Sequence, residues 1–164
     1  MNEHWENGQN LTPRACGEFL GKRWEFRGDI IDDSEHHWIS YIGPDYYTEG
    51  GAAGTPLPFA ADIYRKTFGH IGGYGSSSGG WERKWLRRIY NPGFVNGVIS
   101  RKVAKVFVFF KNETSEEALI IESGHPDMQF FLLPYLPKIQ WTEIVALDAE
   151  GYELDRALPW KLPQ

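Results

Sequence analysis

The chain has little cysteine and no long hydrophobic run. Its one cysteine, Cys16, excludes an intramolecular disulfide and supplies too few thiols for a cysteine-type zinc site. The run Val103–Phe110 is too short to cross a membrane and is interrupted by Lys105. Residues 1–6 contain neither a basic segment nor an apolar core, so they do not resemble a signal peptide. We therefore expect a soluble protein without a transmembrane segment, which is cytoplasmic unless a targeting segment has been removed, and extracytoplasmic in that case.

Basic residues are outnumbered by acidic ones, and the formal net charge is −5. An acidic balance argues against dedicated nucleic-acid binding. The segment Trp81–Lys105 nevertheless has a charge of +6, which leaves −11 for the rest of the chain. This basic strip could contact an anionic partner or pair with acids of the same molecule. Its members are Arg83, Lys84, Arg87, Arg88, Arg101, Lys102 and Lys105.

Aromatic residues, glycine and proline are abundant. Seven Trp, eight Tyr and ten Phe accompany 18 Gly and 10 Pro among 164 residues. Aromatic side chains favour strands, whereas Gly and Pro favour turns. The composition therefore predicts a β-rich domain with many loops. Some rings are expected in the core, and others could stack on sugars or anchor a partner protein.

The last third of the chain predicts short strands separated by turns. Asp148–Gly151 has Asp at the first position and Gly at the fourth position of a type I turn, which predicts a hairpin. We expect a β-meander with one buried face, and the spacing of the turns is typical of a sandwich or barrel. The expected strands lie near Val95–Ser100, Val103–Phe110, Ala118–Glu122, Gln129–Leu133, Glu143–Asp148 and Tyr152–Arg156.

The first half predicts one further strand pair. Arg23–Ile30 alternates apolar and charged side chains, as a half-buried strand does. The turn Asp32–Glu35 and the return strand His37–Ile42 follow it. Trp81–Tyr90 fits both helical and strand spacing, and the turn Asn91–Gly93 after it favours a strand.

Three zones of the chain follow from these patterns. Residues 1–20 are expected to form an N-terminal arm. Residues 21–164 are expected to form a single all-β domain, an antiparallel β-sandwich of immunoglobulin-like or related type. A flexible, Gly-rich loop insertion is expected within it, near 43–80.

The C-terminal strands carry a pattern of Gly and Val positions. It begins with G-F-V-N-G-V-I-S-R-K-V-A-K-V-F-V from Gly93, continues through Ala118 and Phe130, and ends in the hairpin Ile144–Leu154. This pattern resembles a broad, mostly uncharacterised group of bacterial extracytoplasmic β-sandwich domains. The resemblance covers roughly the last 70 residues, and it departs at Asn112–Thr114, where a glycine turn is usual. It implies a sandwich fold and supplies no site residues.

Two polar clusters could carry chemistry. Carboxylates and imidazoles could bind a divalent metal or act as a general base, but a solvated turn is the simpler interpretation of both clusters. Adjacent histidines on a strand also point to opposite faces. The first cluster is Asp32, Asp33, Glu35, His36 and His37, and the second is Glu122, His125 and Asp127. We predict no catalytic residue, metal ion or cofactor.

The expected function is therefore binding. We predict a non-enzymatic protein-interaction domain, either a cell-envelope accessory domain or an immunity-type inhibitor whose acidic body neutralises a basic toxin. The alternative is a carbohydrate-binding module that uses exposed aromatic residues. A third hypothesis is a hydrolase with a carboxylate pair drawn from Asp32, Asp33, Glu35 or Asp45. The candidate binding residues are Trp38, Tyr46, Tyr47, Tyr74, Trp81, Trp85, Arg83, Arg87 and Arg88.

Overall fold

The computed structural model describes residues 10–43, 46–56, 67–74, 92–136 and 139–158, which contain twelve β-strands in three antiparallel sheets. Sheet A consists, in this spatial order, of β1 (Pro13–Phe19), β2 (Lys22–Ile31), β3 (Ser34–Gly43) and β4 (Tyr46–Pro56). Sheet B consists of β5 (Phe68–Tyr74), β6 (Gly93–Ser100), β10 (Met128–Tyr135) and β9 (Leu119–Ile121). Sheet C consists of β12 (Glu153–Ala157), β11 (Trp141–Leu147), β7 (Lys105–Phe110) and β8 (Ser115–Glu117). The predicted all-β, sandwich-like fold is confirmed, and these ranges contain no helix that could cross a membrane.

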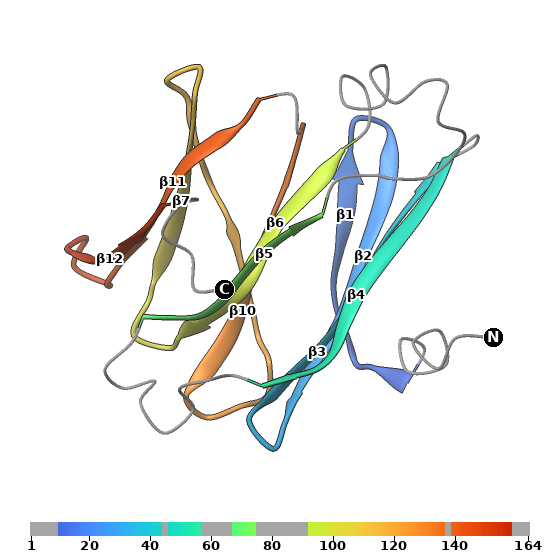
Figure 1. Cartoon of the computed structure of the whole chain (residues 1–164), viewed down its shortest axis with the longest axis horizontal. Helices are drawn as coiled ribbons and strands as arrows, with labels where there is room; N and C mark the ends of the chain where they lie inside the picture. The colour runs from blue at the N-terminus through green and yellow to red at the C-terminus, as the bar shows by residue number, and fades with distance from the viewer. Residues whose placement is uncertain (1–9, 44–45, 57–66, 75–91, 137–138, 159–164) are drawn as a thin grey trace.

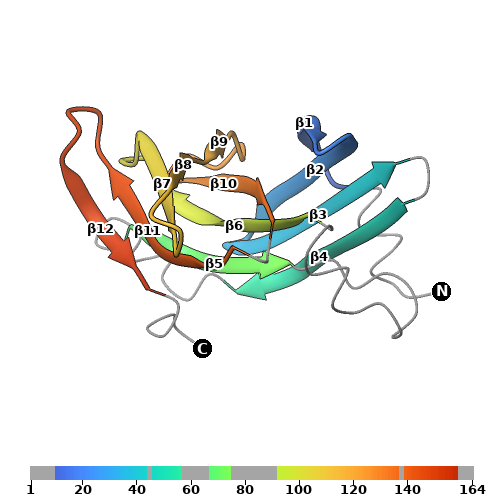
Figure 2. The same ribbon diagram turned by 90° about the horizontal axis from the view of Figure 1, so that it is seen from above.

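Sheet B lies between the other two sheets (Figures 1 and 2). Every residue of β6 is buried, because each face of sheet B packs against a neighbouring sheet. Phe94 and Val98 enter the core shared with sheet A, whereas Val95 and Ile99 enter the core shared with sheet C. A strand with two buried faces is expected to be largely apolar, which is the pattern of this segment apart from Asn96 and Ser100.

The core between sheets A and B is aromatic. The predicted alternation in β2 is confirmed, since Trp24 and Phe26 are buried and the charged residues between them are not. The ring of Tyr41 stacks on Phe94 with 4.3 Å between centroids. The Tyr41 hydroxyl also donates a 3.2 Å hydrogen bond to the carbonyl of Gly93. These contacts fix how β3 lies against β6.

The core between sheets B and C is mostly aliphatic. The chain passes from sheet C to sheet B at Ala118, which separates β8 from β9 and whose amide donates to the Val106 carbonyl at 2.8 Å. The two sheets are therefore joined covalently at one edge as well as packed together. The buried residues of this core are Val95, Ile99, Val103, Val106, Val108, Phe110, Ala118, Phe131, Leu133, Ile144 and Ala146.

The predicted β11–β12 turn is confirmed. The Gly151 amide donates to the Asp148 carbonyl at 3.1 Å, and Gly151 has a φ of +88°, a conformation that favours glycine. The Asp148 carboxylate accepts hydrogen bonds from the amides of Glu150 and Tyr152, at 3.0 and 2.8 Å. Asp148 therefore organises the turn through its side chain as well as its carbonyl.

Three expectations differ from the structure. From β6 onward, β6, β9 and β10 belong to sheet B while β7, β8, β11 and β12 belong to sheet C, so these strands form no single meander. The second half of the expected arm is β1, which pairs with β2. The expected insertion near 43–80 contains β4 and β5, which pair with β3 and β6. Edge strands that are Gly-rich or only partly buried have weak patterns, because pairing orders them more than their own side chains do.

Candidate functional site

The outer face of sheet C is the candidate site. Its central strands place Phe107 opposite Val145 and Phe109 opposite Glu143. The neighbouring residues Val106, Val108 and Phe110 point inward to the core, so the odd-numbered side chains of β7 face out. We call Phe107, Phe109, Val145 and Leu147 the sheet C strip.

The strip is apolar and partly open to solvent. Phe109 is 39% exposed, whereas Val145 is 6% exposed because its cross-strand neighbours Phe107 and Arg156 flank it. Leu154 in β12 and Tyr152 just before that strand are 40% and 73% exposed. An exposed aromatic ring beside other apolar side chains on a sheet face is typical of an interaction surface.

Charged residues border the strip on both sides. On β8, Glu117 lies opposite Phe107. On β12, Arg156 pairs with Glu143 and, at 2.7 Å from its Nε, with Glu153. The Arg156 charge is therefore offset within the sheet, while Glu117 forms no ion pair with any described residue. The two hairpins over residues 105–117 and 141–157 contain eight acidic and three basic residues, so the region that includes the strip has a net negative charge.

The outer face of sheet C is too small to form a stable interface alone. Four strands about 4.8 Å apart and about five residues long give a face of roughly 300 Å². A standard interface covers about 800 Å² on each partner. The charged border and the β11–β12 hairpin would have to take part in any specific contact.

The predicted aromatic and basic binding residues lie elsewhere or outside the described ranges. Trp38 is on the outer face of sheet A, between Arg27 on β2 and Gly51 on β4. A Cβ atom at Gly51 would lie 2.7 Å from Cε3 of Trp38, so the indole packs directly on the β4 backbone. Tyr46 and Tyr47 begin β4 and Tyr74 ends β5. Outside the described residues lie Trp81, Trp85, Arg83, Arg87 and Arg88.

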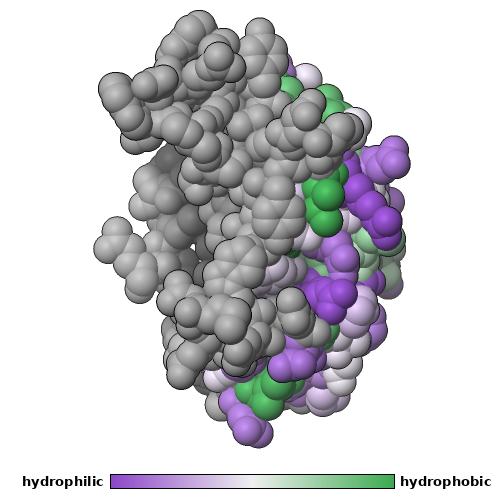
Figure 3. All heavy atoms as spheres, turned by 90° about the vertical axis from the view of Figure 1, so that its right-hand side faces the viewer, coloured by the Kyte–Doolittle hydropathy of each residue, from purple (hydrophilic) through white to green (hydrophobic). Residues whose placement is uncertain are grey.

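The side of the molecule that sheet A forms is mixed in character (Figure 3). On the coloured part of this surface, hydrophilic residues predominate and the hydrophobic ones form separate patches. Trp38 is half-buried there, beside the ion pair between Arg27 Nε and Glu25 Oε1 at 2.6 Å. Trp38 therefore lies among charged side chains on this face.

The two polar clusters predicted from the sequence meet in space. Asp33 has a φ of +59° in the β2–β3 turn, and its Oδ1 lies 3.4 Å from Nε2 of His125. Nδ1 of His125 accepts a 3.0 Å hydrogen bond from the Asp127 amide. The buried hydroxyl of Ser123 donates to the Met128 carbonyl instead of facing the imidazole. Both ring nitrogens are therefore engaged, and the cluster joins sheet A to sheet B without the geometry of an activated nucleophile.

Ion pairs and hydrogen bonds lower the pKa of two carboxylates near this junction, Glu122 and Asp29. The side chain of Arg101 binds both oxygens of Glu122, which with the Gly124 amide lowers the pKa of Glu122 to about 2. Partial burial tends to raise the pKa of Asp29, but hydrogen bonds from Thr12 and Arg14 outweigh it and leave that pKa below its ordinary value. One member of the basic strip thus pairs with an acid of the same molecule.

Glu35 and His37 are part of the core. Both side chains are at most 1% exposed, and Nδ1 of His37 lies 2.7 Å from Oε1 of Glu35. The ring of Phe26 stacks on His37 at 6.0 Å. The interpretation of this cluster as a solvated turn is therefore corrected for Glu35 and His37, because β3 begins at Ser34 and turns both side chains inward. Across the described ranges, no group of three or more His, Cys, Asp or Glu residues could hold a metal ion.

The sequence did not reveal the sheet C strip. Residues 103–110 are apolar at both even and odd positions, so their pattern does not show which side chains face solvent. The placement of Lys105 among the odd positions is the available signal for the outer face.

No family model, curated protein or solved structure matches this chain. The resemblance to bacterial extracytoplasmic domains therefore stays a prediction. Any functional proposal depends on the geometry of the chain itself.

Proposed function

We propose that this chain is a non-enzymatic interaction domain that binds a basic protein through the outer face of sheet C. The observation that supports the proposal is the exposed ring of Phe109 in an apolar strip within a region of net negative charge. Specific interfaces combine an apolar centre that includes aromatic anchors with a polar rim. A partner with a hydrophobic patch among Lys and Arg residues would complement this face.

Electrostatics would contribute mainly to the rate and selectivity of association. The carboxylates around the strip attract a basic partner over distances comparable with the screening length of the solution. They repel acidic proteins, which include other copies of this chain. Binding should therefore weaken as salt rises, while the apolar contact at Phe109 sets how slowly the complex dissociates.

Capture from the source cell with matched variants tests this proposal. Immobilised wild type, Phe109→Thr and Glu117→Lys would be compared, with Trp38→Ala as the control on the outer face of sheet A. We expect a basic protein that wild type and Trp38→Ala retain and that the two sheet C variants lose. With the purified partner, Phe109→Thr should weaken affinity about tenfold, as removal of an interface aromatic does.

Two results would count against the proposal. One is a partner that Phe109→Thr retains as well as wild type does. The other is the recovery of no protein above the Phe109→Thr background. Far-ultraviolet circular dichroism and thermal melts of each variant would exclude unfolding as the cause of a loss.

A carbohydrate-binding module is the second candidate, favoured by the position of Trp38. Its indole lies against Gly51 on the outer face of sheet A, beside the Arg27–Glu25 ion pair. A ring on a flat sheet with charged neighbours could stack on a sugar while those neighbours bind hydroxyl groups. Oligosaccharide titrations followed by tryptophan fluorescence should then show saturable changes that Trp38→Ala abolishes. Unchanged fluorescence across neutral and acidic oligosaccharides would remove this candidate.

A further inference from the structure

A small pocket lies where the β1–β2 hairpin approaches the β7–β8 hairpin and the end of β10. Its volume is about 110 Å³. A water molecule occupies roughly 30 Å³ in the liquid, so the pocket has room for a group of about four non-hydrogen atoms. Its lining residues are Phe19, Phe110, Thr114, Glu116, Tyr135, Leu136 and Ile139.

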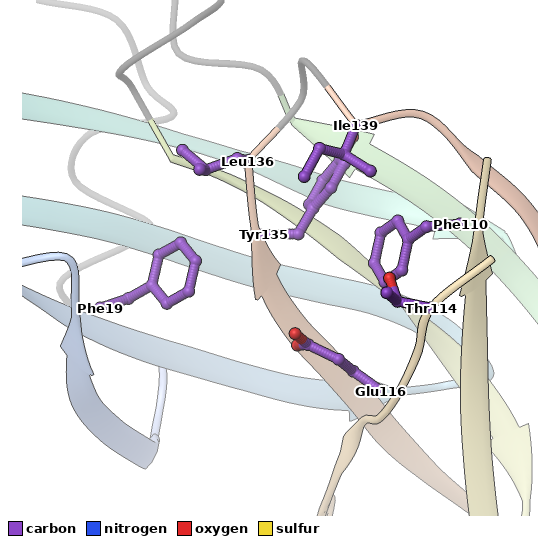
Figure 4. Close-up of a pocket in the computed structure, with 7 residues that line it drawn as sticks. All are labelled: Phe19, Phe110, Thr114, Glu116, Tyr135, Leu136 and Ile139. Atoms are coloured by element: carbon purple, nitrogen blue, oxygen red, sulfur yellow. The ribbon is translucent and has the colours of Figure 1, made fainter. Parts of the chain in front are cut away.

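The lining combines three aromatic residues with one carboxylate. Phe19 lies on one side and Phe110 on the other, and the Glu116 carboxylate extends into the space between them (Figure 4). The rings of Phe110 and Tyr135 are 6.0 Å apart and tilted by 30°. Glu116 forms no ion pair or hydrogen bond with any described residue, so its charge is available to a ligand.

These features select one class of ligand. The carboxylate disfavours anions, and a neutral apolar group would use the rings but leave the negative charge without a counter-charge. A primary ammonium needs acceptors for three N–H groups, whereas most side chains that line the pocket are aromatic or aliphatic. A quaternary ammonium needs no hydrogen-bond acceptor, and aromatic rings attract it through cation–π interactions.

We propose that this pocket binds a trimethylammonium group, with Phe19, Phe110 and Tyr135 surrounding the methyl groups and Glu116 supplying the counter-charge. Burial raises the pKa of the Tyr135 phenol, which keeps its ring neutral at physiological pH. The pocket lies on the inner side of β8, because Glu116 pairs with Val108 while Glu117 pairs with Phe107 of the outer strip. This site is therefore independent of the proposed protein-binding face.

Choline and its neutral carbon isostere, 3,3-dimethyl-1-butanol, are the probes. Amide chemical shifts in ¹H–¹⁵N spectra of the full chain would be followed at Thr114, Glu116 and Leu136 during titration. We expect saturable shifts with a dissociation constant on the order of 1 mM for choline and about tenfold weaker binding of the isostere. The ratio of the two constants measures the contribution of the positive charge.

Matched variants test whether choline binds at this pocket. Glu116→Gln should weaken choline binding about two- to fivefold and leave the isostere unchanged. Glu113→Gln, in the same hairpin and outside the lining, should change neither constant. Phe19→Leu should reduce the preference for choline over the isostere. A peptide that contains trimethyllysine, titrated in parallel, shows whether the group binds better on a protein than as a free molecule.

Two outcomes would overturn the proposal. Equal binding of choline and its isostere would make the pocket a general apolar site. No saturable shift with either probe would make it a packing gap between hairpins. Since Phe109→Thr changes neither lining nor charge here, failure of this site and failure of the protein-binding face give separate results.

Discussion

Asn96 carries a buried side-chain amide whose replacement should stabilise the protein. It lies on β6, is 1% exposed, and neither its Oδ1 nor its Nδ2 has a hydrogen-bond partner among the described protein groups. Its face is shared with Phe94 and Val98, which pack against sheet A. Opposite it on β10 is Leu132. An amide in this position loses its hydration on folding and gains little in return.

The size of the effect follows from that loss. Burial of an unpaired amide costs about 1–3 kcal/mol in proteins. Leucine has nearly the same shape and adds apolar contacts with Leu132 and the aromatic core. Asn96→Leu should therefore raise the free energy of unfolding by about 1–3 kcal/mol, with the melting temperature rising about 2–4 °C for each kcal/mol. Asn96→Asp should act in the opposite direction, because it brings a charge into the same place.

Urea unfolding followed by tryptophan fluorescence measures both variants against wild type. A higher urea midpoint with an unchanged dependence of the unfolding free energy on urea would show that the native state is more stable and that the compactness of the denatured state is unchanged. A loss of more than about 1 kcal/mol in Asn96→Leu would refute the reasoning. It would mean that the amide is hydrogen-bonded through an internal water, or that the core cannot accept a branched side chain.

Three further predictions concern the junction, sheet A and the last hairpin. Glu122→Gln should lower the free energy of unfolding by at most about 1 kcal/mol, because the ion pair with Arg101 is exposed. Folding lowers the pKa of Glu122 from 4.5 to about 2, so the stability difference between wild type and Glu122→Gln should persist down to about pH 4.5 and vanish near pH 2. Urea unfolding across this pH range measures it. Gly51→Ala should lower the free energy of unfolding by about 1–3 kcal/mol, because the added Cβ would overlap the His37 carbonyl oxygen. An unchanged melting temperature would contradict this packing. Asp148→Ala removes two hydrogen bonds to the β11–β12 turn. The free energy of unfolding should fall by about 1 kcal/mol, and the Tyr152 amide should exchange faster with solvent.

Local signals in the sequence predict where strands lie better than they predict which strands pair. The alternation in β2 and the Asp148–Gly151 turn depend on neighbouring residues, so they were readable. The pairing of β6 with β10 depends on which other sheets cover their faces, and both strands are apolar on both faces apart from a few polar residues, so their pattern gives no preference. For the same reason Phe109 could not be assigned to the surface, and the contact between Asp33 and His125 could not be foreseen. Trp81 and Arg87, which carried much of the predicted site, lie outside the described residues.

The order of strands in the three sheets has a consequence for how the chain folds. Sheet A is built from four consecutive strands, so all its pairings are local and can form quickly. Sheets B and C interleave, and the partner of β6 arrives only with β10. During synthesis, sheet A would be complete while Trp24, Phe26, Ile39 and Tyr41 still lacked the surface that buries them. Until sheet B forms, this aromatic face is exposed to solvent, and misassembly or chaperone capture would begin there.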